Sequence, residues 1–287
     1  MANKYLSGGV FFLALSALVI SVGAMAQQPP AAGPAIYQRF APIDLTGNWV
    51  SVVTEDWEVR MITPAKGDFV SLPLNAAGQK VANAWDPAKD QAAGEACKAY
   101  SAPALLRIPG RLKISWQEGG KTLRIDTDAG QQTRLLRFAA AEPTGEAGWE
   151  GYSAASWDYA GGFDPAVAIA AAARAAAAPA AADPSVSPAG ARRGRGGPVL
   201  TPQGGALRVV TTHLKPGYLR KNGIPYSKDA VLTETFNIHA DPYGTDWMIV
   251  TSVVHDPTYL AVDYIVSTNF KREPDDSKWR PKPCSFQ

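Results

Sequence analysis

The chain has 287 residues, a formal net charge of +2 at pH 7 and two cysteines. This length fits one large domain or two small ones. The charge is too small to indicate a nucleic-acid-binding protein, and the one dense basic run, residues 192–195, contains no aromatic residue. The two cysteines and three histidines are not clustered, so the sequence predicts neither a metal site nor a bound cofactor.

Residues 1–26 have the pattern of a secretory signal peptide. Lys4 precedes an apolar run at 10–22, and Ala24-Met25-Ala26 forms a small-residue cleavage site. The run is shorter than the roughly 20 residues of a spanning helix, although a retained anchor is the alternative. We expect cleavage near Ala26, a periplasmic or secreted protein, and no membrane span in the mature chain.

Export has a consequence for the cysteines. Cys97 and Cys284 are an even pair in an oxidising compartment, which favours a disulfide, with two separate thiols as the alternative.

Residues 27–43 are rich in Pro and Ala and should form a linker. After this linker, apolar and polar residues alternate along most of the chain, a pattern typical of half-buried strands. The strands should form one domain, residues 44–287, with each strand antiparallel to its predecessor. Nine or ten strands favour closure, so we predict an all-β antiparallel meander barrel of the lipocalin or calycin kind, with a two-sheet sandwich as the alternative. The expected strands cover residues 49–61 (bent near Thr54), 111–116, 123–126, 133–138, 151–159, 207–214, 231–239, 246–255 and 263–272.

Two segments interrupt this pattern. Residues 65–104 should be a helical insertion, with Asn75 capping a helix at 76–85 and a second helix at 90–100. Residues 164–205 are rich in Ala, Gly and Arg and read as a disordered insertion with at best a frayed helix.

Short motifs resemble known proteins. Gly47-x-Trp49 resembles the G-x-W of the first lipocalin strand, where the Trp plugs the closed end of the barrel. Residues 262–264 resemble part of the second lipocalin motif, and Arg272 matches the basic residue that packs over that Trp.

A longer series of motifs resembles a widespread group of exported bacterial proteins of unknown function. That resemblance implies export and an all-β core, and it implies no reaction. Members often have His where this chain has Tyr226. The matching segments are residues 74–87, Trp149-x-Gly151-x-Ser153, Trp157, residues 209–212, Gly223-x-Pro225-x-Ser227 and Thr233-Glu234-x-Phe236.

Two ionisable residues interrupt apolar faces of the expected strands. Glu234 is in line with Leu232 and Phe236, and His213 is in line with Val209 and Thr211. A buried carboxylate must be neutralised, paired or hydrated, so Glu234 needs a partner. We expect Arg134, Arg137 or His213; the alternatives are a reversed strand that exposes Glu234 and a purely structural histidine.

The loop at 215–229 lies beside His213. Its Asn222-Gly223 turn signal predicts an ordered loop. As a lid at the barrel mouth, it would offer Tyr218, Arg220 and Tyr226 to an anionic or aromatic ligand; an ordinary hairpin is the alternative.

These observations predict a barrel that binds a small apolar or aromatic molecule in its interior. One alternative is a cofactor-independent lyase, isomerase or hydrolase, with Glu234 as base and His213 or Tyr226 as acid. Another is a structural envelope protein with a filled barrel. The sequence indicates no oligomeric state. The expected ligand contacts are Trp49, Trp57, Trp116, Trp157, Phe236 and Trp247 inside, with Tyr218 and Arg220 at the mouth.

Overall fold

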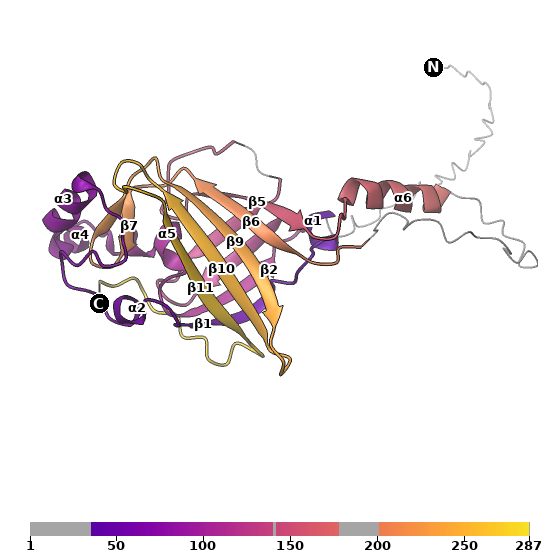
Figure 1. Ribbon diagram of the computed structural model, residues 1–287, viewed down its shortest axis with the longest axis horizontal. Coiled ribbons are helices and arrows are strands. Elements are labelled where there is room, and N and C mark those ends of the chain that lie inside the picture. Colours follow the sequence, from indigo (N-terminus) through magenta and orange to yellow (C-terminus); the bar gives the residue numbers. More distant parts are fainter. Residues whose placement is uncertain (1–35, 140–141, 178–200, 287) are drawn as a thin grey trace, which may run out of the picture. The chain divides into compact units, whose positions relative to one another are not determined.

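The computed structural model describes residues 36–139, 142–177 and 201–286. Within them, nine strands close into a barrel in the order β1-β11-β10-β9-β6-β5-β4-β3-β2 (Figure 1). The expected all-β barrel is therefore confirmed. Its strands are β1 (Gly47–Val52), β2 (Arg111–Trp116), β3 (Thr122–Thr127), β4 (Thr133–Arg137), β5 (Tyr152–Tyr159), β6 (Gly205–Thr212), β9 (Val231–Ala240), β10 (Asp246–His255) and β11 (Tyr264–Glu273).

One pair of neighbouring strands departs from the expected antiparallel meander. β4 and β5 are parallel, with Leu136 beside Ser153 and Arg137 beside Ala154. Eight pairs are antiparallel, including the β1–β11 pair that closes the barrel. An odd number of strands cannot alternate in direction around a closed ring. The expectation of uniformly antiparallel neighbours is therefore wrong at β4–β5.

The chain leaves the barrel after β1, although a strand was expected to continue to residue 61. Asp56 has a φ of 50°, a left-handed conformation that aspartate tolerates, and helix α2 (Trp57–Met61) follows it. Trp57 and Met61 are four residues apart and thus share one helical face, which is exposed. The expected strand is wrong beyond Val52.

A cap covers the barrel end at which β1 finishes and β11 begins. It contains α2, α3 (Ala76–Ala84), α4 (Pro87–Ala92), the 3₁₀ helix η1 (Ala96–Tyr100), α5 (Ala102–Leu105) and the hairpin of β7 (Gly217–Arg220) and β8 (Ile224–Tyr226) (Figure 1). Asn75 Oδ1 accepts a hydrogen bond of 2.9 Å from Gly78 N, which confirms the predicted cap of α3. Pro87 begins α4 instead of only ending α3. The helical insertion thus serves to close one end of the barrel.

The opposite end carries α1 (Ile36–Arg39) and α6 (Pro165–Ala177). Phe40 packs against Phe163 and Ala168, and Trp157 Nε1 donates to the Tyr37 carbonyl at 2.8 Å. The second half of the expected linker is therefore packed against the domain. The expected signal peptide and residues 178–200 of the insertion lie outside the described residues.

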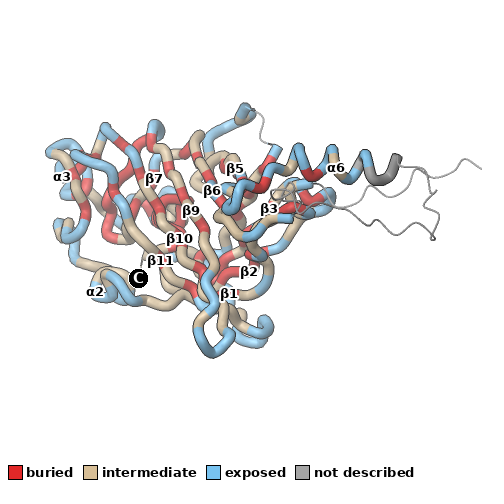
Figure 2. The backbone as a smooth tube through the Cα atoms, turned by 45° about the vertical axis from the view of Figure 1, so that its right-hand side comes forward, coloured by how far each residue is buried: buried red, intermediate tan, exposed pale blue. Residues whose placement is uncertain are grey.

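Apolar side chains fill the barrel. Figure 2 shows buried residues concentrated along the strands, while α3 and α6 are mostly exposed. One apolar cluster surrounds Trp49, Phe236 and Phe270. A second joins the cap to the barrel through Leu214, Leu232 and Tyr226. Full burial of each large apolar side chain contributes about 1.5–3 kcal/mol, so these two clusters hold the fold together.

Cys97 and Cys284 form the expected disulfide, which joins η1 to the C-terminal tail. The tail is also held by Gly130 N, which donates to the Lys282 carbonyl at 2.9 Å. Lys113 Nζ lies 4.6 Å from the centre of the Trp279 ring. No helix within the described ranges is both long and apolar enough to cross a membrane.

Candidate functional site

Glu234 points into the barrel, as its place in the alternation predicted, and pairs with Arg134. Arg134 Nη2 lies 2.6 Å from Glu234 Oε2, and Nη1 lies 3.0 Å from Oε1. Both side chains are at most 1 % exposed. Arg134 Nη2 also donates to Thr211 Oγ1 at 3.2 Å, and the Ser153 and Thr211 hydroxyls are 2.8 Å apart.

This ion pair forms a polar layer between the two apolar clusters. Leu232, two residues before Glu234 on β9, belongs to the cap-side cluster. Phe236, two residues after Glu234, belongs to the other cluster. Both carboxylate oxygens are engaged by the guanidinium. The carboxylate is thus committed to a buried ion pair.

His213 does not enter the barrel, contrary to expectation. β6 ends at Thr212, and His213 has a φ of 56°, which breaks the alternation of the strand. Its Nε2 instead lies 2.9 Å from the Gly145 carbonyl, in the loop between β4 and β5. The histidine therefore belongs to a loop contact.

Tyr226 is fully buried in the cap, on β8. Burial raises the pKa of its hydroxyl, a contact with the Ser101 hydroxyl lowers it, and the charge of Glu150 raises it. No hydrogen bond joins Glu234, His213 and Tyr226, all three of which the structure describes. The expected catalytic constellation is not formed.

The aromatic residues expected inside the barrel fall into three groups. Trp49, Trp157 and Phe236 are core residues, as the alternation indicated. Trp116 is half-buried at the α1 end, with its ring 5.3 Å from that of Phe138. Two expectations are wrong, because Trp57 is on the outer face of α2 and Trp247 is on the outer face of β10, where its Nε1 donates to Asp241.

The loop at 215–229 is ordered, as its turn signal predicted. Asn222 Nδ2 donates to the carbonyls of Ala65 and Asp68, both at 3.0 Å. Tyr218 is not free to meet a ligand, because its hydroxyl donates to Asp90 Oδ2 at 2.6 Å. Burial and then this carboxylate raise the pKa of Tyr218.

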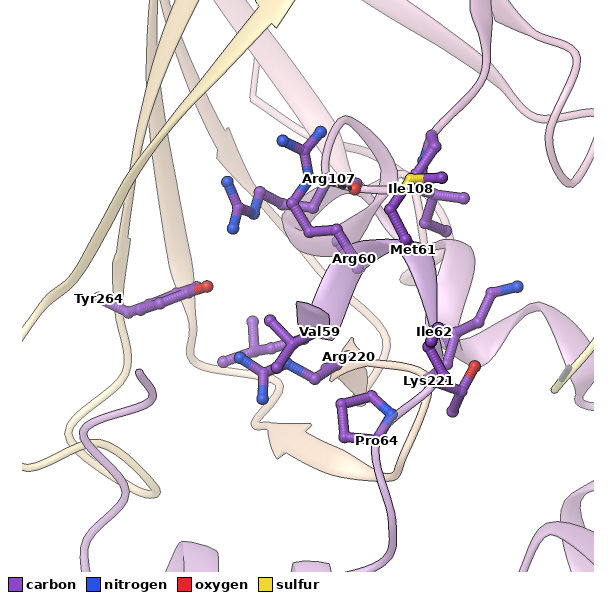
Figure 3. Close-up of a pocket in the computed structure, with 15 residues that line it drawn as sticks. Val59, Arg60, Met61, Ile62, Pro64, Arg107, Ile108, Arg220, Lys221 and Tyr264 are labelled. Carbon is purple, nitrogen blue, oxygen red and sulfur yellow. Dashed lines mark hydrogen bonds between the residues drawn. The ribbon is translucent and has the colours of Figure 1, made fainter. Parts of the chain in front are cut away.

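Arg220, the last residue of β7, takes part in a cavity of about 120 Å³ in the cap. The cavity lies between α2, the segment at 104–109, β7 and the start of β11. Figure 3 shows the guanidinium groups of Arg60 and Arg107 on one side of the Tyr264 hydroxyl and that of Arg220 on the other. We call this cavity the arginine pocket.

The three arginines differ in how their N–H groups are satisfied. Arg107 donates to Asp56 at 2.5 Å and to the Ser267 carbonyl at 2.8 Å. Arg60 Nε donates to the Arg107 carbonyl at 2.9 Å, but its buried Nη1 and Nη2 have no hydrogen-bond partner among the residues that the structure describes. Arg220 Nη2 donates to the Val70 carbonyl at 2.9 Å, and its buried Nη1 is likewise unsatisfied. The pocket therefore presents unused donors on two cations.

The electrostatics of the pocket agree with its geometry. Burial, and then the positive charge of Arg107, lowers the pKa of Arg60 to about 10. Burial also lowers the pKa of Arg220. A lowered pKa means that the surroundings of each cation do not fully replace its hydration. An anion in the pocket would supply the missing charge and the missing acceptors.

Arg220 was predicted from the sequence as a ligand contact, whereas Arg60, Arg107 and Tyr264 were not. Arg60 was predicted to lie in a strand, but it is part of helix α2. Arg107 and Tyr264 come from segments that are distant from it in the sequence. One charged residue, Arg60, among apolar neighbours at 59–62 was the local signal.

Known protein families, curated protein sequences and solved structures contain no match to this chain.

Proposed function

We propose that the protein binds a small organic anion in the arginine pocket. The observation that carries the proposal is the pair of buried, unsatisfied N–H groups on Arg60. A buried donor without an acceptor costs roughly 1–3 kcal/mol, and more when it is charged. A bound oxyanion would remove this penalty through charge-assisted hydrogen bonds.

The walls favour an organic anion over an inorganic one. Apart from Thr63 and Lys221, the remaining lining is apolar, and pockets for organic ligands combine such walls with a few convergent polar groups. The apolar residues include Val59, Met61, Ile62, Pro64, Ile108 and Leu219. An engineered cavity of about 150 Å³ accepts benzene, so this pocket has room for a group slightly smaller than one aromatic ring.

The proposal changes the role of the barrel. The large side chains around Trp49 and Phe236 occupy its interior, so the barrel acts as a rigid scaffold and the ligand binds in the cap. The loop at 215–229, which contains the β7–β8 hairpin, was expected to contact an anionic or aromatic ligand, and the proposed ligand is an anion. The Cys97–Cys284 disulfide supports action in an oxidising compartment, the periplasm or the exterior.

Calorimetric titration tests the proposal. Butanoate and hexanoate should bind the wild-type protein, while the neutral butanamide and hexanamide should bind at least tenfold more weakly. Arg60→Gln should lose about 10- to 150-fold in affinity for the carboxylates, which corresponds to the 1.5–3 kcal/mol of a hydrogen bond to a charged group.

The matched control is Arg208→Gln, because Arg208 is exposed on β6, outside the pocket. It should bind like the wild type. Equal affinities in the wild type and in Arg60→Gln would contradict the proposal.

The filled barrel favours a second candidate, a structural protein with no small-molecule ligand. Its signature would be the absence of binding and of thermal stabilisation with every organic and inorganic anion tested, in the wild type as well as in the variants.

A further inference from the structure

The polarity of the arginine pocket changes from its base to its mouth. At the base, Tyr264 is 6 % exposed and Leu219 is 5 % exposed. At the rim, Met61 is 61 % exposed and Ile62 is 69 % exposed. Since lining residues with such exposure must border the opening, the pocket is cationic at its base and carries these two apolar side chains at its mouth. Lys221 also lines the pocket and lies beside Ile62 (Figure 3).

The apolar rim continues beyond the cavity. Trp57 is 59 % exposed on the same face of α2 as Met61. Val70 is 63 % exposed, and its carbonyl is held by Arg220. Large apolar side chains gathered beside a ligand pocket are typical of a surface that meets an apolar partner.

The unused donors indicate the headgroup. Nη1 and Nη2 belong to one planar guanidinium, and both are free on Arg60. This fork matches the two oxygens of one carboxylate in a bidentate pair. The carbon atoms that follow the carboxylate would then contact the apolar walls of the pocket.

From these observations we infer that the ligand is a carboxylate amphiphile, with its headgroup on Arg60 and its hydrocarbon tail leaving over Met61 and Ile62. This inference rests on the proposed function and specifies its ligand class. The volume of about 120 Å³ accepts the headgroup and the first carbons, so the rest of a longer chain lies on the rim. The site is separate from the filled interior of the barrel.

A homologous series of straight-chain carboxylates tests the inference. Titrations of butanoate, hexanoate, octanoate and decanoate, each kept below its aggregation concentration, should show affinity rising about fourfold per methylene, or about 0.8 kcal/mol. The gain should level off where the chain passes the rim. The matching alkyl alcohols should bind at least tenfold more weakly at every length.

The rim is tested by the double variant Met61→Ser/Ile62→Ser. It should lose affinity progressively with chain length, least for butanoate and at least tenfold for decanoate. Val167→Ser is the matched control, since Val167 is 42 % exposed on α6, at the other end of the barrel. It should retain the full gain.

The outcomes separate this inference from the proposed function. If carboxylates bind in an Arg60-dependent way but gain no affinity with chain length, the ligand is not an amphiphile, while the proposed anion-binding function stands. Arg60-dependent binding of inorganic phosphate or sulfate in preference to carboxylates does the same. The absence of binding for every anion overturns both.

Discussion

Arg134 and Glu234 form a fully buried bidentate ion pair, with Nη2 2.6 Å from Oε2 and Nη1 3.0 Å from Oε1. The two residues are 100 positions apart in the chain and come from strands β4 and β9. Two hydroxyls, of Ser153 and Thr211, complete the polar layer. This layer sits between two apolar clusters, so its removal tests the packing of the barrel without touching the arginine pocket.

Glu234→Gln should destabilise the protein by about 3–5 kcal/mol, because the Arg134 charge would remain buried without its counterion. Urea unfolding measures this change. The double variant Arg134→Met/Glu234→Leu should regain most of the loss, since it removes both charges and retains the volume.

The exposed pair of Arg124 and Asp126 provides the control for this prediction. Asp126→Asn should cost at most about 1 kcal/mol, as expected of a surface ion pair. A change of similar size in Glu234→Gln would contradict the structural role of the buried pair.

Trp49 and Arg272 close the barrel end that lies opposite the cap. The Arg272 guanidinium lies 4.2 Å from the centre of the buried Trp49 ring and donates to the Asp44 and Thr46 carbonyls. Arg272→Ala should lower the free energy of unfolding by about 2 kcal/mol through these lost charged hydrogen bonds. Denaturant titration measures the effect.

Arg280 is the comparison for Arg272, because its hydrogen bonds go only to nearby carbonyls in the exposed tail. Arg280→Ala should change the stability by less than about 0.5 kcal/mol. If Arg272→Ala is equally mild, the closure of this end does not depend on the arginine.

The disulfide between Cys97 and Cys284 encloses a long loop, with a sequence separation of 187. In the chain-entropy model its loss costs up to about 5 kcal/mol, an upper bound that neglects native strain. The variant Cys97→Ser/Cys284→Ser should therefore melt at a lower temperature than the wild type. Reductant should lower the melting temperature of the wild type and leave that of the double variant unchanged; a wild type insensitive to reductant would contradict the role of the disulfide.

Arg60 should reduce the stability of the ligand-free protein. Its pKa is lowered to about 10, so the fold disfavours the charged form relative to the unfolded chain. This penalty is present below pH 10 and is relieved as the pH rises through about 10. At pH 7, Arg60→Gln should thus melt at the same temperature as the wild type or higher, and any advantage should shrink above pH 10.

Arg107→Gln is the contrasting variant, because Arg107 is paired with Asp56 and the Ser267 carbonyl. It should be destabilised by about 1–3 kcal/mol at pH 7. If Arg60→Gln is destabilised as strongly as Arg107→Gln, then Arg60 serves the fold and not a ligand.

The sequence predicted most of the barrel because its strands repeat with a period of two. The bounds of β10, Asp246–His255, agree with the expectation, since its inward residues are apolar except for Ser252, which is paired with Glu234 on β9. The same period placed Glu234 inside. Arg134 and Arg137 are three residues apart, so the same period of two places them on opposite faces of β4. Arg137 indeed lies outside the barrel, over the Tyr152 ring.

The arginine pocket was harder to predict for physical reasons. The segment at 57–61 fits a period of two, but its apolar ends also fit a short helix, and local sequence does not distinguish the two. A left-handed residue, Asp56, decides between them. The pocket then forms from four segments brought together by the cap, a relation that no local pattern contains.

A crystal structure of the protein with 6-bromohexanoate would show where the ligand binds, because the anomalous signal of bromine locates the end of the chain. We expect carboxylate density within hydrogen-bond distance of Arg60 Nη1 and Nη2, and bromine at the rim beside Met61 and Ile62. Bromine inside the barrel near Trp49 and Phe236, or an empty arginine pocket in crystals soaked above the measured dissociation constant, would contradict it.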